Sequence, residues 1–134
     1  MTNCNRHQPA LKRLQRQAVE ADFDGGTLTS DGGLLLLREV DQRLNLVQRI
    51  ADVIPDPRDP KYIEHSQAEL LTSRIFGIAA GYEDANDQQQ LRHDPAFLVA
   101  AGRTPTENND TSDQQALASP ATHSRFANRI DSKT

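Results

Sequence analysis

A group of acidic side chains between positions 83 and 94 is the first candidate for a metal-binding site in this chain. Glu83, Asp84 and Asp87 lie close together, with His93 and Asp94 a few positions further on. Metal-dependent phosphoryl transfer requires carboxylates of this kind. However, Asp84 and Asp94 each stand where a residue is expected to cap a short helix, and no spacing places the others on one face. The pattern favours capping, so we assign no metal ligand and no cofactor to this chain.

Other motifs of catalysis are missing from the sequence. The pairs Gly25-Gly26 and Gly32-Gly33 lack the spacing of phosphate-binding loops, and Asp31 would repel an anion beside the second pair. The four histidines have no ligand-like spacing, the single cysteine has no partner, and no nucleophile motif is present. We therefore assign no catalytic residue.

Basic side chains gather near the two ends of a chain whose net charge is −4. Residues 1–19 contain four cations and no acid, and two arginines stand about one turn apart on the last predicted helix. Cations placed in this way can contact the phosphates of DNA, although solvated chain ends explain the same pattern. The candidate DNA contacts are Arg6, Lys12, Arg13, Arg16, Arg125 and Arg129.

A two-residue alternation precedes the first predicted helix. Val19, Ala21 and Phe23 alternate with acidic residues, and the turn sequence Asp24-Gly25-Gly26 follows. Residues 27–29 can return as a second strand, which predicts a short N-terminal β-hairpin. Upstream, residues 1–18 are expected to form a basic flexible tail that could contain a short helix around residues 9–17.

Apolar residues recur at helical spacing after the expected hairpin. Leu34, Leu37, Val40 and Leu44 predict a helix with a single apolar stripe. Asn45 is expected to separate this helix from a short second one. Three prolines between positions 55 and 60 then predict a loop, because each removes a backbone donor and disfavours helix in the residue before it.

Four further helices are expected after this loop. The first runs from about residue 64 to residue 80 and ends at Gly81. Its apolar stripe consists of Leu71, Ile75, Ile78 and Tyr82. Asp84 opens a short glutamine-rich helix, and Asp94-Pro95 opens another that leads to residue 102. The last helix begins around Pro120.

These elements predict a mainly α fold with a short N-terminal β-hairpin. The expected divisions are a basic flexible tail over 1–18, a hairpin plus helical domain over 19–102, a mobile loop over 103–116, and a last helix with a truncated end over 117–134. No apolar run is long enough to span a membrane, and the start lacks a secretory signal. We therefore expect a cytoplasmic protein that has no membrane partner.

Five blocks of the sequence, in order, resemble bacterial insertion-sequence transposases of the DDE type. They are FDGGTLTSDGGLLLLREVD at residues 23–41, DPRDP at 56–60 followed by HS at 65–66, GIAAGYEDAND at 77–87, LRHDP at 91–95 and LASPATHSRFANR at 117–129. Because the five blocks are collinear, they specify the family better than any one of them does.

The resemblance implies the N-terminal part of an RNase H-like transposase that moves DNA by cut-and-paste transposition. In that family three carboxylates bind two Mg²⁺ ions, which activate the attacking oxygen. The first catalytic aspartate is expected on a strand after the last block, so no residue here corresponds to the triad. Mg²⁺ is accordingly expected for the full-length family and not for this chain. We interpret the chain as a truncated transposase that recognises the element's terminal inverted repeats or serves as scaffold, without catalysis of its own.

Two other classes of protein fit the same residues. A stand-alone helical DNA-binding module would depend on the basic ends and could compete with full-length transposase. A helical protein-interaction module would instead self-associate through its first apolar stripe.

Overall fold

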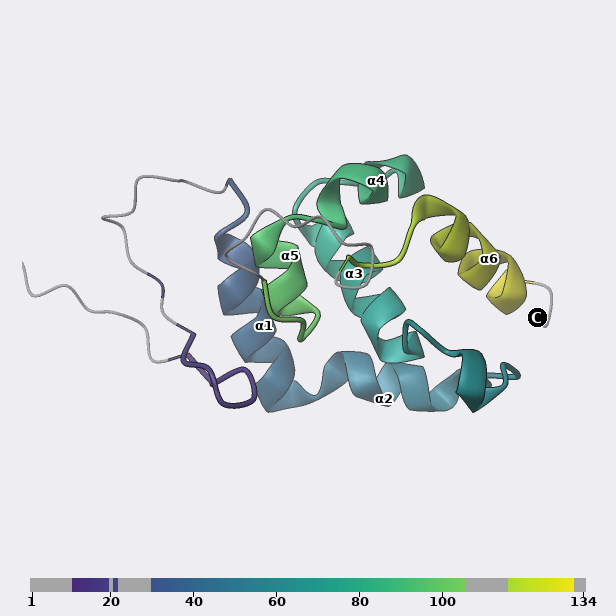
Figure 1. The fold of residues 1–134 in the computed structure, drawn as a ribbon, viewed down its shortest axis with the longest axis horizontal. Coiled ribbons are helices and arrows are strands. Elements are labelled where there is room, and N and C mark those ends of the chain that lie inside the picture. The colour runs from purple at the N-terminus through teal and green to yellow at the C-terminus, as the bar shows by residue number, and fades with distance from the viewer. Residues whose placement is uncertain (1–10, 20, 22–29, 106–115, 132–134) are drawn as a thin grey trace, which may run out of the picture.

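The computed structural model describes residues 11–19, 21, 30–105 and 116–131, and this part of the chain is helical (Figure 1). The α-helices are α1 (Gly33–Leu44), α2 (Leu46–Val53), α3 (Gln67–Ala79), α4 (Gln88–Leu91), α5 (Pro95–Ala100) and α6 (Pro120–Asp131). Two 3-10 turns, η1 (Pro60–Tyr62) and η2 (Ala85–Asp87), precede α3 and α4. The mainly α prediction is confirmed. Within these described ranges there is no strand, and most of the expected hairpin falls on residues outside them.

Residues 11–19 pack against α1, although residues 1–18 were expected to form a flexible tail. Leu14 is buried, the Lys12 backbone N–H donates to a Glu39 carboxylate oxygen at 3.0 Å, and Arg38 donates to the Lys12 carbonyl at 3.2 Å. The short helix considered around residues 9–17 is wrong over its described part. Leu14 and Gln17 instead exchange two backbone hydrogen bonds across a tight turn in which Gln15 has a φ of 52°.

The predicted stripe of α1 is only half correct. Leu34 is buried and Leu37 packs against the core, whereas Val40 and Leu44 are exposed. Arg38 and Glu39 are buried in their place. The segment around Lys12 covers this face of α1, and its backbone N–H and carbonyl groups find their hydrogen-bond partners in Glu39 and Arg38.

Helix α3 lies at the centre of the fold and contacts α2, α5 and α6 (Figure 1). Leu70, Leu71 and Phe76 are buried, but Ile78, expected in the apolar stripe, is exposed. The helix begins at Gln67 and not near residue 64, because the Ser66 hydroxyl accepts from the Glu69 N–H at 3.1 Å as its N-cap. It ends before Gly81, whose φ of 98° is the left-handed value expected at a helix stop.

The two predicted aspartate caps are confirmed. Asp84 accepts from the Asn86 N–H at 2.9 Å at the start of η2. Asp94 accepts from the Ala96 and Phe97 N–H groups at 2.8 and 3.2 Å, with Pro95 in the first turn of α5. Local capping therefore fixes where both short helical segments begin.

A buried segment leads from the core into α6. Leu117 is fully buried, its N–H donates to the Arg92 carbonyl at 2.9 Å, and the Arg92 side chain donates to the Leu117 carbonyl at 3.2 Å. Phe126 then anchors α6 on the core. The expected loop over 103–116 has packed ends at Arg103 and Ala116, and its residues 106–115 lie outside the described part. None of the described helices is long and apolar enough to cross a membrane.

Candidate functional site

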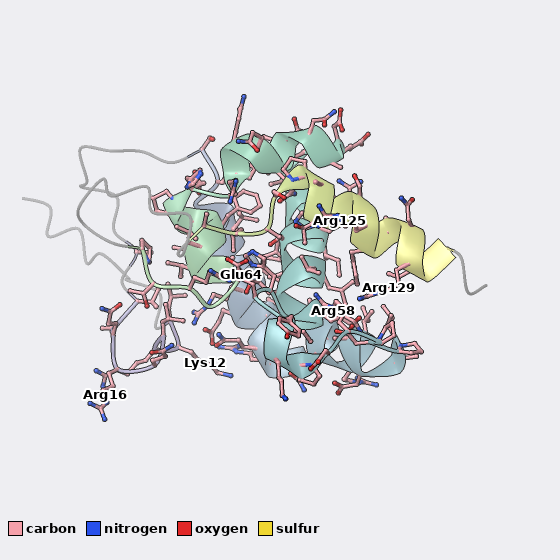
Figure 2. All side chains as sticks on the ribbon, turned by 45° about the vertical axis from the view of Figure 1, so that its right-hand side comes forward. Lys12, Arg16, Arg58, Glu64, Arg125 and Arg129 are labelled. Atoms are coloured by element: carbon pink, nitrogen blue, oxygen red, sulfur yellow. The ribbon has the colours of Figure 1, made fainter. Side chains whose placement is uncertain are left out.

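A groove of about 420 Å³ lies between α6, the turn η1 and the beginning of α3. Its lining includes three arginines, Arg58, Arg125 and Arg129, together with Tyr62 and Glu64. We call it the arginine groove. Figure 2 shows Arg58, Arg125 and Arg129 gathered beside α6 although Arg58 comes from a distant loop. Guanidinium groups gathered in this way are the usual protein partners of phosphate oxygens.

Arg58 is held in place by the loop that carries it. Its Nε and Nη2 atoms donate to the two carboxylate oxygens of Asp56 at 2.8 and 2.6 Å, and Nη1 donates to the His65 carbonyl at 3.1 Å. Hydrogen bonds from Arg58 lower the pKa of Asp56 from 3.8 to about 2, with the charge of Arg129 contributing. The carboxylate is therefore ionised at neutral pH and cancels part of the positive charge of the groove.

Arg129, a predicted DNA contact, is engaged inside the molecule. Its guanidinium donates to Asp56 at 3.0 Å and to the Gln67 side-chain oxygen at 2.6 Å, and it lies 5.1 Å from the centre of the Phe126 ring. Gln67 in turn donates to the carbonyls of Ala51 and Ile54 at the end of α2. With its side chain only 18% exposed, Arg129 joins α6 to α2 and α3.

Arg125 lies one turn before Arg129 and differs from it in environment. It is exposed, and within the described ranges no hydrogen bond or ion pair is found for its guanidinium. Arg125 is thus the cation of the groove whose donors are available to a phosphate.

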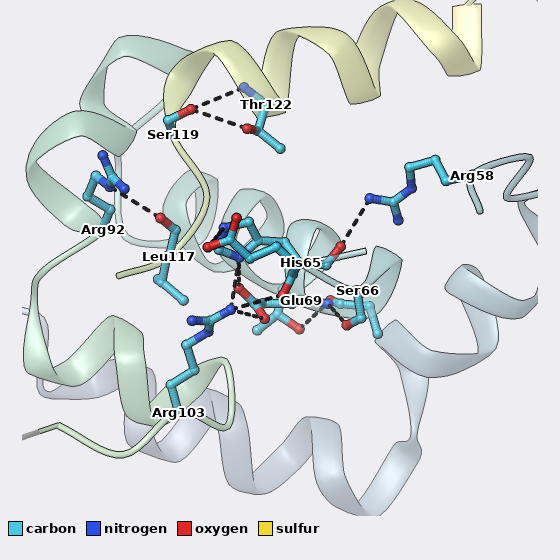
Figure 3. A network of polar contacts seen from close by, with 12 residues as sticks. Arg58, His65, Ser66, Glu69, Arg92, Arg103, Leu117, Ser119 and Thr122 are labelled. Atoms are coloured by element: carbon cyan, nitrogen blue, oxygen red, sulfur yellow. Dashed lines mark hydrogen bonds and ion pairs between the residues drawn. The ribbon is translucent and has the colours of Figure 1, made fainter. Parts of the chain in front are cut away.

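A network of polar contacts surrounds His65, which lines the groove, as Figure 3 shows. The buried His65 places Nδ1 2.7 Å from a carboxylate oxygen of Glu69, and Arg103 donates to the other oxygen at 3.1 Å. Arg103 also places Nη2 2.9 Å from the same His65 nitrogen. These contacts connect Arg103, in the segment that follows α5, with the first turn of α3. They fix the backbone carbonyl of His65 that holds Arg58.

The basic residues near the N-terminus lie outside the arginine groove. Lys12, Arg13 and Arg16 are exposed around the turn that packs on α1, and Figure 2 places Lys12 and Arg16 away from the arginines of α6. Arg13 donates to the Arg16 carbonyl at 2.7 Å. Arg6 is outside the described residues. The predicted DNA contacts therefore do not form a single surface.

The acidic residues weighed as a metal site are not brought together. In the part of the chain that the structure describes, no three His, Cys, Asp or Glu side chains are placed to hold a metal ion. The oxygens of Asp84 and Asp94 accept hydrogen bonds from the helix starts that they cap.

Sequence reasoning missed Arg58 and Tyr62 because it treated residues 55–60 only as a loop. The pair Asp56 and Arg58, two positions apart among prolines, was a usable signal for a local ion pair. No comparable signal exists for Arg129, which reaches Asp56 across 73 positions of sequence.

Comparison with known proteins identifies a family to which this chain is similar. A family model described as transposase DDE domain group 1 matches residues 11–134. No curated protein and no solved structure gives a significant match.

Proposed function

The chain belongs to the DDE transposases of insertion-sequence type, and from this premise we propose that its helical part recognises the ends of the element and supports the catalytic region. DNA transposition is the activity that the family implies. The observation that carries the proposal is the arginine groove, where Arg125 offers unpaired donors beside Arg58 and Arg129. Lys12, Arg13 and Arg16 would give a second, separate contact with the DNA backbone.

We also propose that Asp56, Asp84 and Asp94 are not ligands of the Mg²⁺ ions that the family uses. Asp56 accepts from two arginines, and Asp84 and Asp94 accept from the backbone N–H groups of helix starts, so each carboxylate already has a partner within the fold. The described part of the chain would then position DNA through its basic residues, and the strand-transfer chemistry would be performed elsewhere in the transposase. A Mg²⁺-dependent nick made by the purified 134-residue chain in element-end DNA would contradict this.

DNA binding can be tested by fluorescence anisotropy with the full chain, a duplex of the terminal inverted repeat, and a scrambled duplex. Affinity should fall steeply as salt rises from 50 to 200 mM, because phosphate contacts release counterions on binding. Arg125→Ala should weaken binding and reduce the log–log salt slope by about 1. Arg49→Ala, which removes an exposed arginine of α2 outside the groove, is the matched control and should change neither value.

The alternative of a protein-interaction module makes the opposite prediction for the same samples. Leu36, Val40 and Leu44 are exposed along α1 and would be covered in a dimer. Light scattering that shows a dimer, together with salt-independent or absent DNA binding, would favour that alternative over the proposed function.

A further inference from the structure

Tyr62 exposes a large aromatic ring on a turn that is held by several hydrogen bonds. Its side chain is 86% exposed. The Asp59 carboxylate accepts from the Lys61 N–H at 3.0 Å, the Asp59 carbonyl accepts from the Tyr62 N–H at 3.0 Å, and Pro60 fixes the first position of the turn. The ring is therefore presented by a constrained backbone, so little backbone conformational entropy is lost when a ligand covers it.

Nothing in the described part of the protein covers this ring. The aromatic contacts found there join Tyr82 to Phe97 and Arg129 to Phe126, and no hydrogen bond of the Tyr62 hydroxyl is present. The other tyrosine, Tyr82, shows the contrast, since it contacts a ring and donates to Asp31 at 3.1 Å. The position of Tyr62 is thus unexplained by the packing of the chain on itself.

Tyr62 lines the same groove as Arg125 and Arg58. An aromatic face next to cations is the combination that binds single-stranded nucleic acid, where bases stack on rings and phosphates meet arginines. A base paired inside a duplex has its faces covered by its neighbours, so only an unpaired base can stack in this way. The volume of about 420 Å³ lies in the usual range for small-molecule sites. Glu64 also lines the groove and repels a phosphate near it. The phosphate is therefore expected at Arg125, whose donors are available.

We propose that the arginine groove binds an unpaired nucleotide of DNA, with its base stacked on Tyr62 and its phosphate on Arg125. This inference rests on the proposed function and narrows its substrate to DNA that carries single-stranded nucleotides. Arg129 and Asp56 act as positioning residues. They hold α6 and Arg58 around the groove, and their polar groups are used in contacts within the fold.

The test is anisotropy with two labelled probes of the same sequence, a single-stranded oligonucleotide and the blunt duplex. Tyr62→Ala should weaken binding of the single strand by about tenfold, the size of one base–aromatic stack, and leave duplex binding within about twofold. Tyr62→Phe should restore the affinity, because it keeps the ring and removes only the hydroxyl. Val53→Ala, at another strongly exposed apolar side chain, is the matched control and should change neither affinity.

Because Tyr62 is so exposed, the variants should keep the helical circular dichroism signal and the melting temperature of the parent chain. Tyr62→Ala with an unchanged single-strand affinity, or with equal losses on both probes, would overturn the inference while leaving the proposed function standing. A parent chain that binds neither probe would overturn both. A change in oligomeric state on Tyr62→Ala without an effect on DNA would show that the ring contacts protein, which also overturns the inference.

Discussion

At the scale of a single residue, His123 shows how burial changes the charge that a side chain carries. It is only 4% exposed on α6, and burial lowers its pKa from 6.5 to about 4, with Arg74 and His65 adding repulsion. The ring is therefore neutral at physiological pH and contributes packing to the core, not positive charge to the groove. A histidine close to two arginines in the sequence is thus not a DNA contact at neutral pH.

This shift predicts acid sensitivity in a defined window. Below pH 6.5 the unfolded chain binds a proton at His123 and the folded chain does not, so the free energy of unfolding should fall as the pH drops from about 6.5 to about 4. The loss is on the order of 3 kcal/mol. Chemical denaturation at a series of pH values measures it, with His123→Gln expected to flatten the curve and the exposed His93→Gln to leave it unchanged. Equal curves for His123→Gln and the parent chain would refute the assignment.

At the scale of secondary-structure elements, the junction of α1 and α2 depends on one residue with left-handed backbone, Asn45. Asn45 has a φ of 52° and a ψ of 37°, and its N–H donates to the Asp41 carbonyl at 2.6 Å. The Asp41 side chain accepts from the Val47 N–H at 2.9 Å and so begins α2. The direction of α2, and with it the support under Gln67 and Arg129, follows from this turn.

A β-branched side chain at position 45 should therefore destabilise the fold. Asn45→Val should lower the free energy of unfolding by about 1–2 kcal/mol, because left-handed backbone is disfavoured for such residues. Asn45→Gly should be neutral or slightly stabilising. Arg49→Val, on an exposed part of α2, is the control for helix propensity and should cost only about half a kcal/mol. A loss of the same size for both valine variants would show that the turn conformation is not the cause.

Helix starts and stops were predictable because their causes are local. Asp84, Asp94-Pro95, Asn45 and Gly81 each act within a few positions, through a cap, a fixed φ or a left-handed residue. Which face of a helix is buried was less predictable, as Val40 shows. That choice depends on a segment far away in the sequence, here the one around Lys12, which draws Arg38 and Glu39 inward.

The candidate site could be predicted only in part at the scale of the whole molecule. The five sequence blocks indicated the family, and the match over residues 11–134 confirms it. The assembly of the groove was not accessible, because it brings a loop near position 58 to a helix near position 129. Arg125 and Arg129 were treated alike on sequence spacing, yet packing makes one of them exposed and the other a structural contact.

The contact of Asp56 with Arg129 should couple the two ends of the groove energetically. A double-mutant cycle of Asp56→Ala and Arg129→Ala, followed by chemical denaturation, should give an interaction of about 1 kcal/mol or more, above the usual range for exposed pairs. The cycle of Asp56→Ala with Arg125→Ala is the control and should be additive within about 0.5 kcal/mol. An additive result for Arg129 as well would show that its contact with Asp56 does not stabilise the fold.

The same variants separate a structural from a DNA-binding role. Arg129→Ala should lower both stability and DNA affinity, because α6 loses its attachment to Asp56 and Gln67 and the groove loses its shape. Arg125→Ala should lower DNA affinity alone, since its exposed side chain supports nothing in the fold. If Arg129→Ala destabilised the chain but left DNA affinity intact, the position of α6 would not matter for binding. The DNA contacts would then have to be sought on the surface around Lys12, Arg13 and Arg16.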